Sequence, residues 1–126
     1  MPEIPEELRY TEDHEWVKLT DGEVQYGITD YAQEELGDIV YIELPEVGEE
    51  VEKGDMIGVV ESVKTVSDLY APISGTIKEV NESLEAAPET INEDPYGDGW
   101  IVTIEYEDKS EYEELMDAEE FKRHIE

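Results

Sequence analysis

The fold of this 126-residue chain is decided by residues 58–75, GVVESVKTVSDLYAPISG. The stretch contains two short segments rich in β-branched residues on either side of Lys64, a composition that favours a half-buried sheet. Pro72 and Gly75 end it, because both residue types interrupt regular structure. No Asn-Gly or Asp-Gly pair marks a tight turn. The prediction of a hairpin that turns near residues 63–65 therefore rests on the two flanking segments.

Lys64 is the only basic residue between Lys53 and Lys78 in a chain that has only eight. Its neighbours are small or β-branched, so at a turn its ammonium group would be sterically open to an enzyme that acylates it. Amide formation would remove the charge. Most single lysines on strands or turns are ordinary exposed residues, however, and local chemistry alone leaves both interpretations open.

Residues 61–75 resemble the lipoyl-lysine segment of the glycine cleavage H-protein family. Further similar segments follow in the order of that family, and the resemblance extends from about Leu8 to the C-terminus. They are HEWV at 14–17, GITDYAQ at 27–33, LGDIV at 36–40, LPEVG at 44–48 and NEDPYGDGW at 92–100. A colinear set of this kind is far more specific than one motif, and it favours a modified Lys64.

Short alternating segments separated by turn signals recur along the chain, which indicates a mainly β fold: a flattened antiparallel barrel or sandwich. The resemblance implies the hammerhead form, in which two facing sheets carry the modified lysine at a hairpin tip. We expect a single carrier domain over residues 1–126, with 1–7 as a loosely ordered lead. The expected strands lie near residues 15–19, 23–28, 38–44, 50–52, 56–60, 76–80 and 100–106.

A short helix is expected near residues 30–36. Asp30 can cap its start and Gly37 can close it in a left-handed conformation. A helix of two turns is marginal alone, so it must pack Tyr31 and Leu36 onto the sheet.

A C-terminal helical segment is expected near residues 111–125. Ser110 and Glu113 have the spacing of a capping box, and Asp117 with Glu120 suggests a second start. Residues 82–90 can form either a loop or a short helical turn.

The amino-acid composition limits the kinds of molecule that this protein is expected to bind. Asp and Glu total 37 against 8 Lys and Arg, which gives a formal net charge of −29. This field disfavours binding to nucleic acids and to anionic membranes. It is consistent with docking on basic partner surfaces and with adaptation to a salt-rich cytoplasm. The acidic N-terminus lacks the pattern of a signal peptide, so we expect a cytoplasmic, prokaryotic location.

Patterns typical of metal sites and catalytic sites are lacking in the sequence. There is no cysteine, and His14 and His124 lie far apart with no ligand spacing around them. No Gly-x-Ser-x-Gly elbow or phosphate-binding glycine loop occurs. Paired carboxylates are too abundant to indicate acid–base catalysis. We therefore expect neither a metal site nor catalytic residues.

The resemblance implies that Lys64 carries lipoate. The residues that would give the attaching enzyme its recognition context are Glu61, Ser62, Val63, Thr65 and Asp68. In this family, residues near the His-Glu-Trp motif help to form a surface cleft that receives the loaded lipoyl arm. The matching cleft positions are Asp13, Glu15 and Thr29, with Asp68 beyond the lysine. Asp13 stands where the family often has a hydroxyl residue.

The implied function is that of a monomeric carrier with no catalytic turnover of its own. A glycine decarboxylase with pyridoxal phosphate would load the arm with an aminomethyl group. A tetrahydrofolate-dependent aminomethyltransferase would take the methylene and release ammonia, and a flavin dihydrolipoyl dehydrogenase would reoxidise the dithiol. A lipoate ligase or transferase would attach the arm.

Three alternatives share the fold. Biotin carriers usually flank their lysine with methionines, whereas Val63 and Thr65 flank Lys64. Lipoyl domains of 2-oxoacid dehydrogenases usually have an Asp before the lysine and continue into a linker and a further domain. A relay that only passes lipoyl groups to other proteins would keep Lys64, and the sequence leaves that alternative open.

Overall fold

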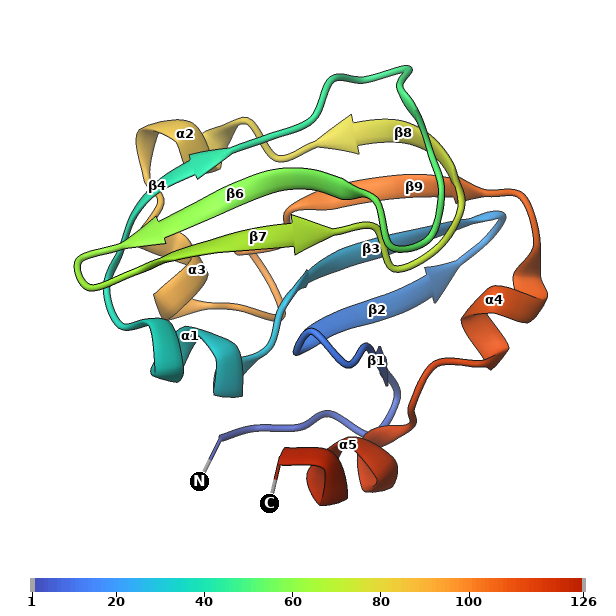
Figure 1. Ribbon diagram of the computed structural model, residues 1–126, viewed down its shortest axis with the longest axis horizontal. Helices are drawn as coiled ribbons and strands as arrows, with labels where there is room; N and C mark the ends of the chain where they lie inside the picture. The colour runs from blue at the N-terminus through green and yellow to red at the C-terminus, as the bar shows by residue number, and fades with distance from the viewer. Residues whose placement is uncertain (1, 126) are drawn as a thin grey trace.

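A computed structural model describes residues 2–125 as two antiparallel sheets with short helices (Figure 1). The six-stranded sheet has the order β1-β2-β3-β9-β8-β5, and the three-stranded sheet has the order β4-β6-β7. The strands are β1 (Arg9–Tyr10), β2 (Glu15–Thr20), β3 (Glu23–Ile28), β4 (Ile39–Glu43), β5 (Glu50–Val51), β6 (Met56–Ser62), β7 (Val66–Tyr70), β8 (Gly75–Val80) and β9 (Val102–Tyr106). The helices are α1 (Asp30–Leu36), α2 (Ser83–Ala86), α3 (Thr90–Glu93), α4 (Lys109–Glu113) and α5 (Ala118–Ile125).

The main core lies between the two sheets. Ile42, Val60 and Leu69 from the three-stranded sheet are at most 2% exposed. They belong to one cluster with fully buried residues of the six-stranded sheet, among them Val17 and Ile104. The expected flattened sandwich is therefore confirmed, and its sheets do not close into a barrel.

A second, smaller cluster lies on the other face of the six-stranded sheet. Successive side chains of a strand point to opposite faces, so Trp16 points away from the core that Val17 enters. Tyr10 stacks on Phe121 with ring centroids 4.7 Å apart, and both are fully buried. This cluster packs α5 against β1. The ring of Phe121 also lies 6.1 Å from that of His14, in the turn that follows β1.

The hairpin expected near residues 63–65 is confirmed, and Ser62 shapes its turn. The N–H of Ser62 donates to the carbonyl of Thr65 at 2.8 Å. Its Oγ accepts from the backbone N–H groups of Lys64 and Thr65 at 3.3 and 3.1 Å. A serine side chain can replace a backbone partner in this way, so no Asn-Gly pair is needed. The turn forms one end of the molecule (Figure 1).

The expected helix at residues 30–36 is confirmed, but its cap is Thr29 and not Asp30. Thr29 has an extended backbone and its hydroxyl accepts from the N–H of Ala32, whereas Asp30 is already helical. Gly37 ends the helix with φ 82° and ψ −158°. Its φ is positive as expected, but its ψ lies outside the left-handed helical region and in one that glycine alone enters readily. Leu36 packs against the main core.

The C-terminal segment contains two helices, α4 and α5. The cap of α4 is Asp108, whose side chain accepts from the N–H of Ser110, so the capping box expected at Ser110 is wrong. The expected start at Asp117 is confirmed. Its backbone N–H donates to Glu120 at 3.0 Å and its carboxylate accepts from the N–H of Glu120 at 2.9 Å.

Residues 2–7, the expected lead, contact the rest of the molecule. The N–H of Glu3 donates to Asp30 at 2.8 Å, and Tyr10 donates its hydroxyl proton to the carbonyl of Pro5. Ile4 packs against the second cluster. Within residues 2–125, no helix has the length and apolar character needed to span a membrane.

Candidate functional site

Lys64 lies exposed at the tip of the β6–β7 hairpin. No ion pair found among residues 2–125 involves it. Its side chain leans over the C-terminal end of α1, because a methyl group added to Gly37 would lie 3.3 Å from Cε of Lys64 and 3.9 Å from its Nζ. The amine is therefore open to solvent, and its stem rests on a backbone that has no side chain at that point.

The residues expected as recognition context surround this lysine. Ser62 builds the turn, as described above, and Val63 and Thr65 are the exposed neighbours of Lys64. Glu61 is half-buried near the end of β6. Asp68 is exposed on β7 and lies near the hydroxyl of Tyr70, at 3.3 Å.

A cavity of about 120 Å³ lies between α1, β7 and the turn that joins β1 to β2. Three of the four expected cleft residues line it: Asp13, Glu15 and Asp68. Leu36 also lines it, and the next residue is Gly37, on which the side chain of Lys64 rests. The complete lining is Asp13, His14, Glu15, Ile28, Ala32, Glu35, Leu36, Val60, Ser67, Asp68 and Leu69. The side chain of Lys64 therefore contacts the chain one residue away from the wall of the cavity.

Glu15 is the buried carboxyl group of this cavity, with 1% of its surface exposed. Its oxygens accept from the hydroxyl of Thr11 at 3.2 Å, from the hydroxyl of Tyr26 at 3.3 Å and from the backbone N–H of Tyr70 at 3.1 Å. Burial raises the pKa of Glu15 to about 8, and nearby Asp13 adds to the rise. The three hydrogen bonds oppose that rise only in part, because none of these donors carries a charge.

Thr29 is fully buried and is not among the residues that line the cavity. Besides capping α1, its hydroxyl and its N–H donate to the carbonyl of His14 at 3.0 and 3.1 Å. Thr29 thus ties the β1–β2 turn to the start of α1. Thr29 therefore positions two walls of the cavity, the β1–β2 turn and α1.

His14 holds an uncommon backbone conformation at this turn, with φ 66°. Its ring meets the edge of Tyr31 at a centroid distance of 5.1 Å and lies 5.7 Å from the ring of His124. Burial lowers the pKa of His14, and the neighbouring His124 lowers it further. The uncharged form of the His14 ring is therefore favoured at this contact between α5 and the β1–β2 turn.

Asn92 of α3 holds the segment between α1 and β4, over which the side chain of Lys64 leans. Its amide nitrogen donates to the carbonyl of Gly37 and to Gln33, both at 2.9 Å, and its amide oxygen accepts from the N–H of Ile39 at 2.8 Å. The connection between α1 and β4 is held at three points by one side chain. The sequence gives no local signal for this role, because Asn92 sits in a run of turn-forming residues far from position 37.

Thr11 and Tyr26 are two further site residues that sequence reasoning missed. Thr11 accepts the N–H groups of Asp13 and Glu15 on its hydroxyl, both at 3.2 Å, and so shapes the β1–β2 turn. Tyr26 alternates with apolar residues on β3, a pattern that indicates only burial. The contacts of both residues with the Glu15 carboxyl group depend on how the chain folds around it.

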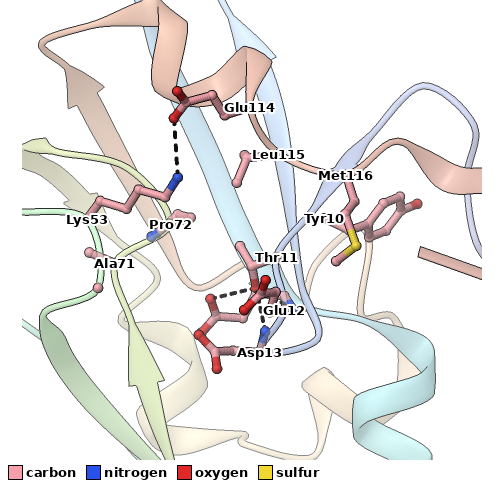
Figure 2. Close-up of a pocket in the computed structure, with 12 residues that line it drawn as sticks. Tyr10, Thr11, Glu12, Asp13, Lys53, Ala71, Pro72, Glu114, Leu115 and Met116 are labelled. Carbon is pink, nitrogen blue, oxygen red and sulfur yellow. Dashed lines mark hydrogen bonds and ion pairs between the residues drawn. The ribbon is translucent and has the colours of Figure 1, made fainter. Parts of the chain in front are cut away.

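A larger cavity of about 270 Å³ lies on the other side of Asp13 and Glu15. Figure 2 shows Lys53 reaching toward Glu114 at its edge, where the ammonium and carboxylate are 3.7 Å apart. Thr11 and Asp13 lie across from that pair. Lys64 lines neither cavity, but α1 and β7, which lie next to the lysine, line the smaller cavity and not the larger one.

No group of three or more metal-ligating side chains is arranged to hold an ion in the described part of the chain. The chemistry of the site is that of an exposed amine, an adjoining small cavity and carboxyl groups of which one is withdrawn from water.

Comparison with known proteins identifies the same family over nearly the whole chain. The family model described as "Glycine cleavage H-protein" matches residues 8–126. The chain is 57% identical to the glycine cleavage system H protein of Anaeromyxobacter sp. (strain K), over 98% of this chain and 97% of that protein. It is also 57% identical to that of Halalkalibacterium halodurans, over 99% and 98%. The crystal structure of such a protein from Mycobacterium marinum superposes with a TM-score of 0.90, at 46% identity, over 97% of this chain and 98% of that one.

Proposed function

The chain belongs to the glycine cleavage H-protein family, the lipoyl carriers of the glycine cleavage system, and we propose that Lys64 is the residue that carries lipoate in amide linkage. The observation that supports this most strongly is the position of Lys64. It is exposed at a hairpin tip and forms no ion pair within residues 2–125. Its side chain leans over Gly37, which follows Leu36, a residue that lines the same cavity as Asp13, Glu15 and Asp68.

When bound, lipoate would supply a disulfide that is reduced as it takes up the aminomethyl group of glycine, and the dithiol left after unloading would then be reoxidised. The work of the chain itself is to hold this arm, to present it and to shelter its load. A tethered group visits several enzymes at high effective concentration without escaping into solution. We propose that the chain has no catalytic turnover of its own.

The partners proposed from the family are a pyridoxal-phosphate glycine decarboxylase, a tetrahydrofolate-dependent aminomethyltransferase and a flavin dihydrolipoyl dehydrogenase. A lipoate ligase or transferase would attach the arm to Lys64, and Glu61, Ser62, Val63, Thr65 and Asp68 would form the surface that this enzyme reads. A monomeric state and a cytoplasmic location are predictions from the sequence that belong to the same proposal.

Glu15 suits the amine of a loaded arm. Its carboxyl group is buried among uncharged donors and keeps its proton near neutral pH, and a bound ammonium group would stabilise the ionised form and pair with it. A hydrogen bond to a charged group contributes roughly 1.5–3 kcal/mol in a protein, against roughly 0–1 kcal/mol for an exposed ion pair. We propose that Glu15 is the principal contact, with Asp13 and Asp68 at the more exposed edge and Thr29 as the residue that positions the turn.

An assay with glycine and purified glycine decarboxylase tests this function. The lipoylated protein should accept the aminomethyl group, and the Lys64→Arg variant should fold normally and accept none. Lipoylated protein that accepts no aminomethyl group, but passes its lipoyl group to other apo-proteins, would support the relay function instead. None of the observations above favours the relay or the biotin carrier.

A further inference from the structure

Large apolar side chains are exposed around Lys64. Six such residues are strongly exposed in the described structure, and four of them lie in the hairpin turn or at the end of the three-stranded sheet next to it. These four, here called the hairpin face, are Val40 (53% exposed), Tyr41 (47%), Val63 (68%) and Val66 (60%). The other two, Val47 and Met56, are exposed to a similar extent away from the hairpin turn (61% and 59%).

A β-bulge in β4 makes this face more apolar than regular alternation would. Residues of a strand alternate between faces, yet Val40 and Tyr41 are both exposed between the buried residues Ile39 and Ile42. The pairing of β4 with β6 shifts between Ile39 and Tyr41, so two residues of β4 lie opposite one step of β6. Bulges of this type redirect side chains, and this one turns an extra valine toward solvent.

Tyr41 and Val66 of the hairpin face are neighbours of the same β6 residue, on opposite sides of that central strand. Tyr41 pairs with Glu61, and Glu61 pairs with Val66, so these three side chains form a row on the outer face. Val63 is fixed beside the same strand, because its N–H donates to the carbonyl of Asp38 at 3.0 Å. The face therefore spans all three strands and ends at Lys64.

We propose that the hairpin face docks the enzyme that acylates Lys64, an inference that rests on the proposed function. The reacting atom is Nζ, which attacks the carbonyl of an activated lipoyl donor, an acyl adenylate or an acyl thioester. The C–N bond forms, the C–O or C–S bond of the donor breaks, and Nζ loses a proton. The catalytic groups must therefore come within one lysine side chain of the turn, which brings the enzyme onto the residues around it.

Enzymes that use the finished arm meet a different geometry. They act on its dithiol end, so the length of the lipoyl group separates their reacting atoms from the hairpin. This difference assigns the face to the acylating enzyme rather than to the decarboxylase or the aminomethyltransferase.

The charges around the face define the complementary surface. Exposed Asp38, Glu43 and Asp68 surround it, and half-buried Glu61 lies between Tyr41 and Val66. A matching enzyme would present apolar side chains at the centre and basic ones at the rim, the usual arrangement of a specific interface. Apolar contacts persist in concentrated salt, whereas rim charges are screened.

The test measures lipoylation of the apo-protein by purified lipoate-protein ligase with lipoate and ATP. Tyr41→Ser and Val66→Ser remove apolar surface from the face, and Val47→Ser and Met56→Ser are controls of similar exposure. Interface residues that matter contribute more than about 1 kcal/mol, so the first pair should lower kcat/KM by roughly tenfold and the controls should leave it unchanged. Matched melting temperatures would show that folding is intact. Equal kcat/KM for all four variants would overturn the proposal.

A second arm separates this proposal from its alternatives. The variants are lipoylated to completion and then assayed with glycine decarboxylase, where rates equal to the parent's are expected. A similar loss in that assay would mean that the face docks the arm-using enzymes, and it would overturn the assignment. If the parent itself acquires no lipoate on Lys64, the proposed function fails and the docking proposal fails with it.

Discussion

Oxygen Oε2 of Glu15 lies 3.1 Å from the backbone nitrogen of Tyr70, so a carboxyl group of the six-stranded sheet occupies a hydrogen-bonding position at the edge of the three-stranded sheet. β7 is an edge strand, and edge strands leave outward N–H groups in need of partners. Glu15 supplies one such partner from the start of β2. The same residue therefore joins the two sheets and forms the buried end of the cavity beside Lys64.

Glu15→Gln should change how stability depends on pH. The folded pKa of about 8 lies above the ordinary pKa of a glutamate side chain, 4.5, so the folded state holds the proton more tightly. The stabilisation that this tighter proton binding contributes is fully present below the pKa of Glu15 in the unfolded chain. It falls by about 1.4 kcal/mol per pH unit between the unfolded and folded pKa values, and it is lost as pH rises through the folded pKa. Glutamine does not ionise, so the melting temperature of the parent should fall relative to the variant from pH 5 to 9. A constant difference over that range would contradict a buried, protonated Glu15.

The same variant should shorten the life of the loaded arm. An exposed aminomethyl adduct breaks down to ammonia and formaldehyde, and the proposed contact with Glu15 would shelter it. Glu15→Gln should leave lipoylation intact but accelerate ammonia release from loaded protein separated from its partners. Glu12→Gln is the matched control, because Glu12 is an exposed neighbour that does not line the smaller cavity. Equal release from the parent and the Glu15 variant would make Glu15 a structural residue only.

Salt should stabilise this protein strongly. A formal net charge of −29 on 126 residues produces self-repulsion in the compact state. The Debye length falls from about 10 Å at 0.1 M salt to about 3 Å at 1 M, so most of that repulsion is screened. We expect the melting temperature to rise markedly between these concentrations in a chloride series. A flat series would mean that the acidic surface has no role in salt adaptation.

Gly37→Ala should disturb the contact between the side chain of Lys64 and the backbone at position 37. The backbone at position 37 disfavours any side chain, and the added methyl would lie 3.3 Å from Cε of Lys64. Gly22 also has a positive φ, 77°, but has no neighbour within 4 Å of such a methyl, so Gly22→Ala is the control. Both variants should lose about 1 kcal/mol or more of stability. At a temperature where both are folded, Gly37→Ala alone should alter the lipoylation rate; equal rates would show that Lys64 does not depend on that contact.

Local patterns predicted the features whose partners are near in sequence. The hairpin at residues 63–65 and the capping box of Asp117 with Glu120 were both visible in the sequence. The cap of α1 was misassigned by one residue because Thr29 and Asp30 are both good capping residues. Only the folded chain shows that the hydroxyl of Thr29 reaches Ala32 and that its N–H reaches His14.

The contacts that build the site join residues far apart in the chain, so local sequence patterns do not predict them. Glu15 meets Tyr70 across 55 positions, and Asn92 meets Gly37 across 55. Alternation on β2 predicts which face Glu15 takes, yet it does not reveal that neutral donors surround the carboxyl group. The family resemblance named Asp13, Glu15, Thr29 and Asp68 together, and the structure places all of them except Thr29 around one cavity.

Peptide mapping of the native protein by mass spectrometry is the decisive test of lipoylation at Lys64. We expect one lipoyl amide per chain, located on Lys64 and on no other lysine, and its complete loss in Lys64→Arg. Biotin on Lys64, or lipoate on Lys53 or Lys78, would contradict it.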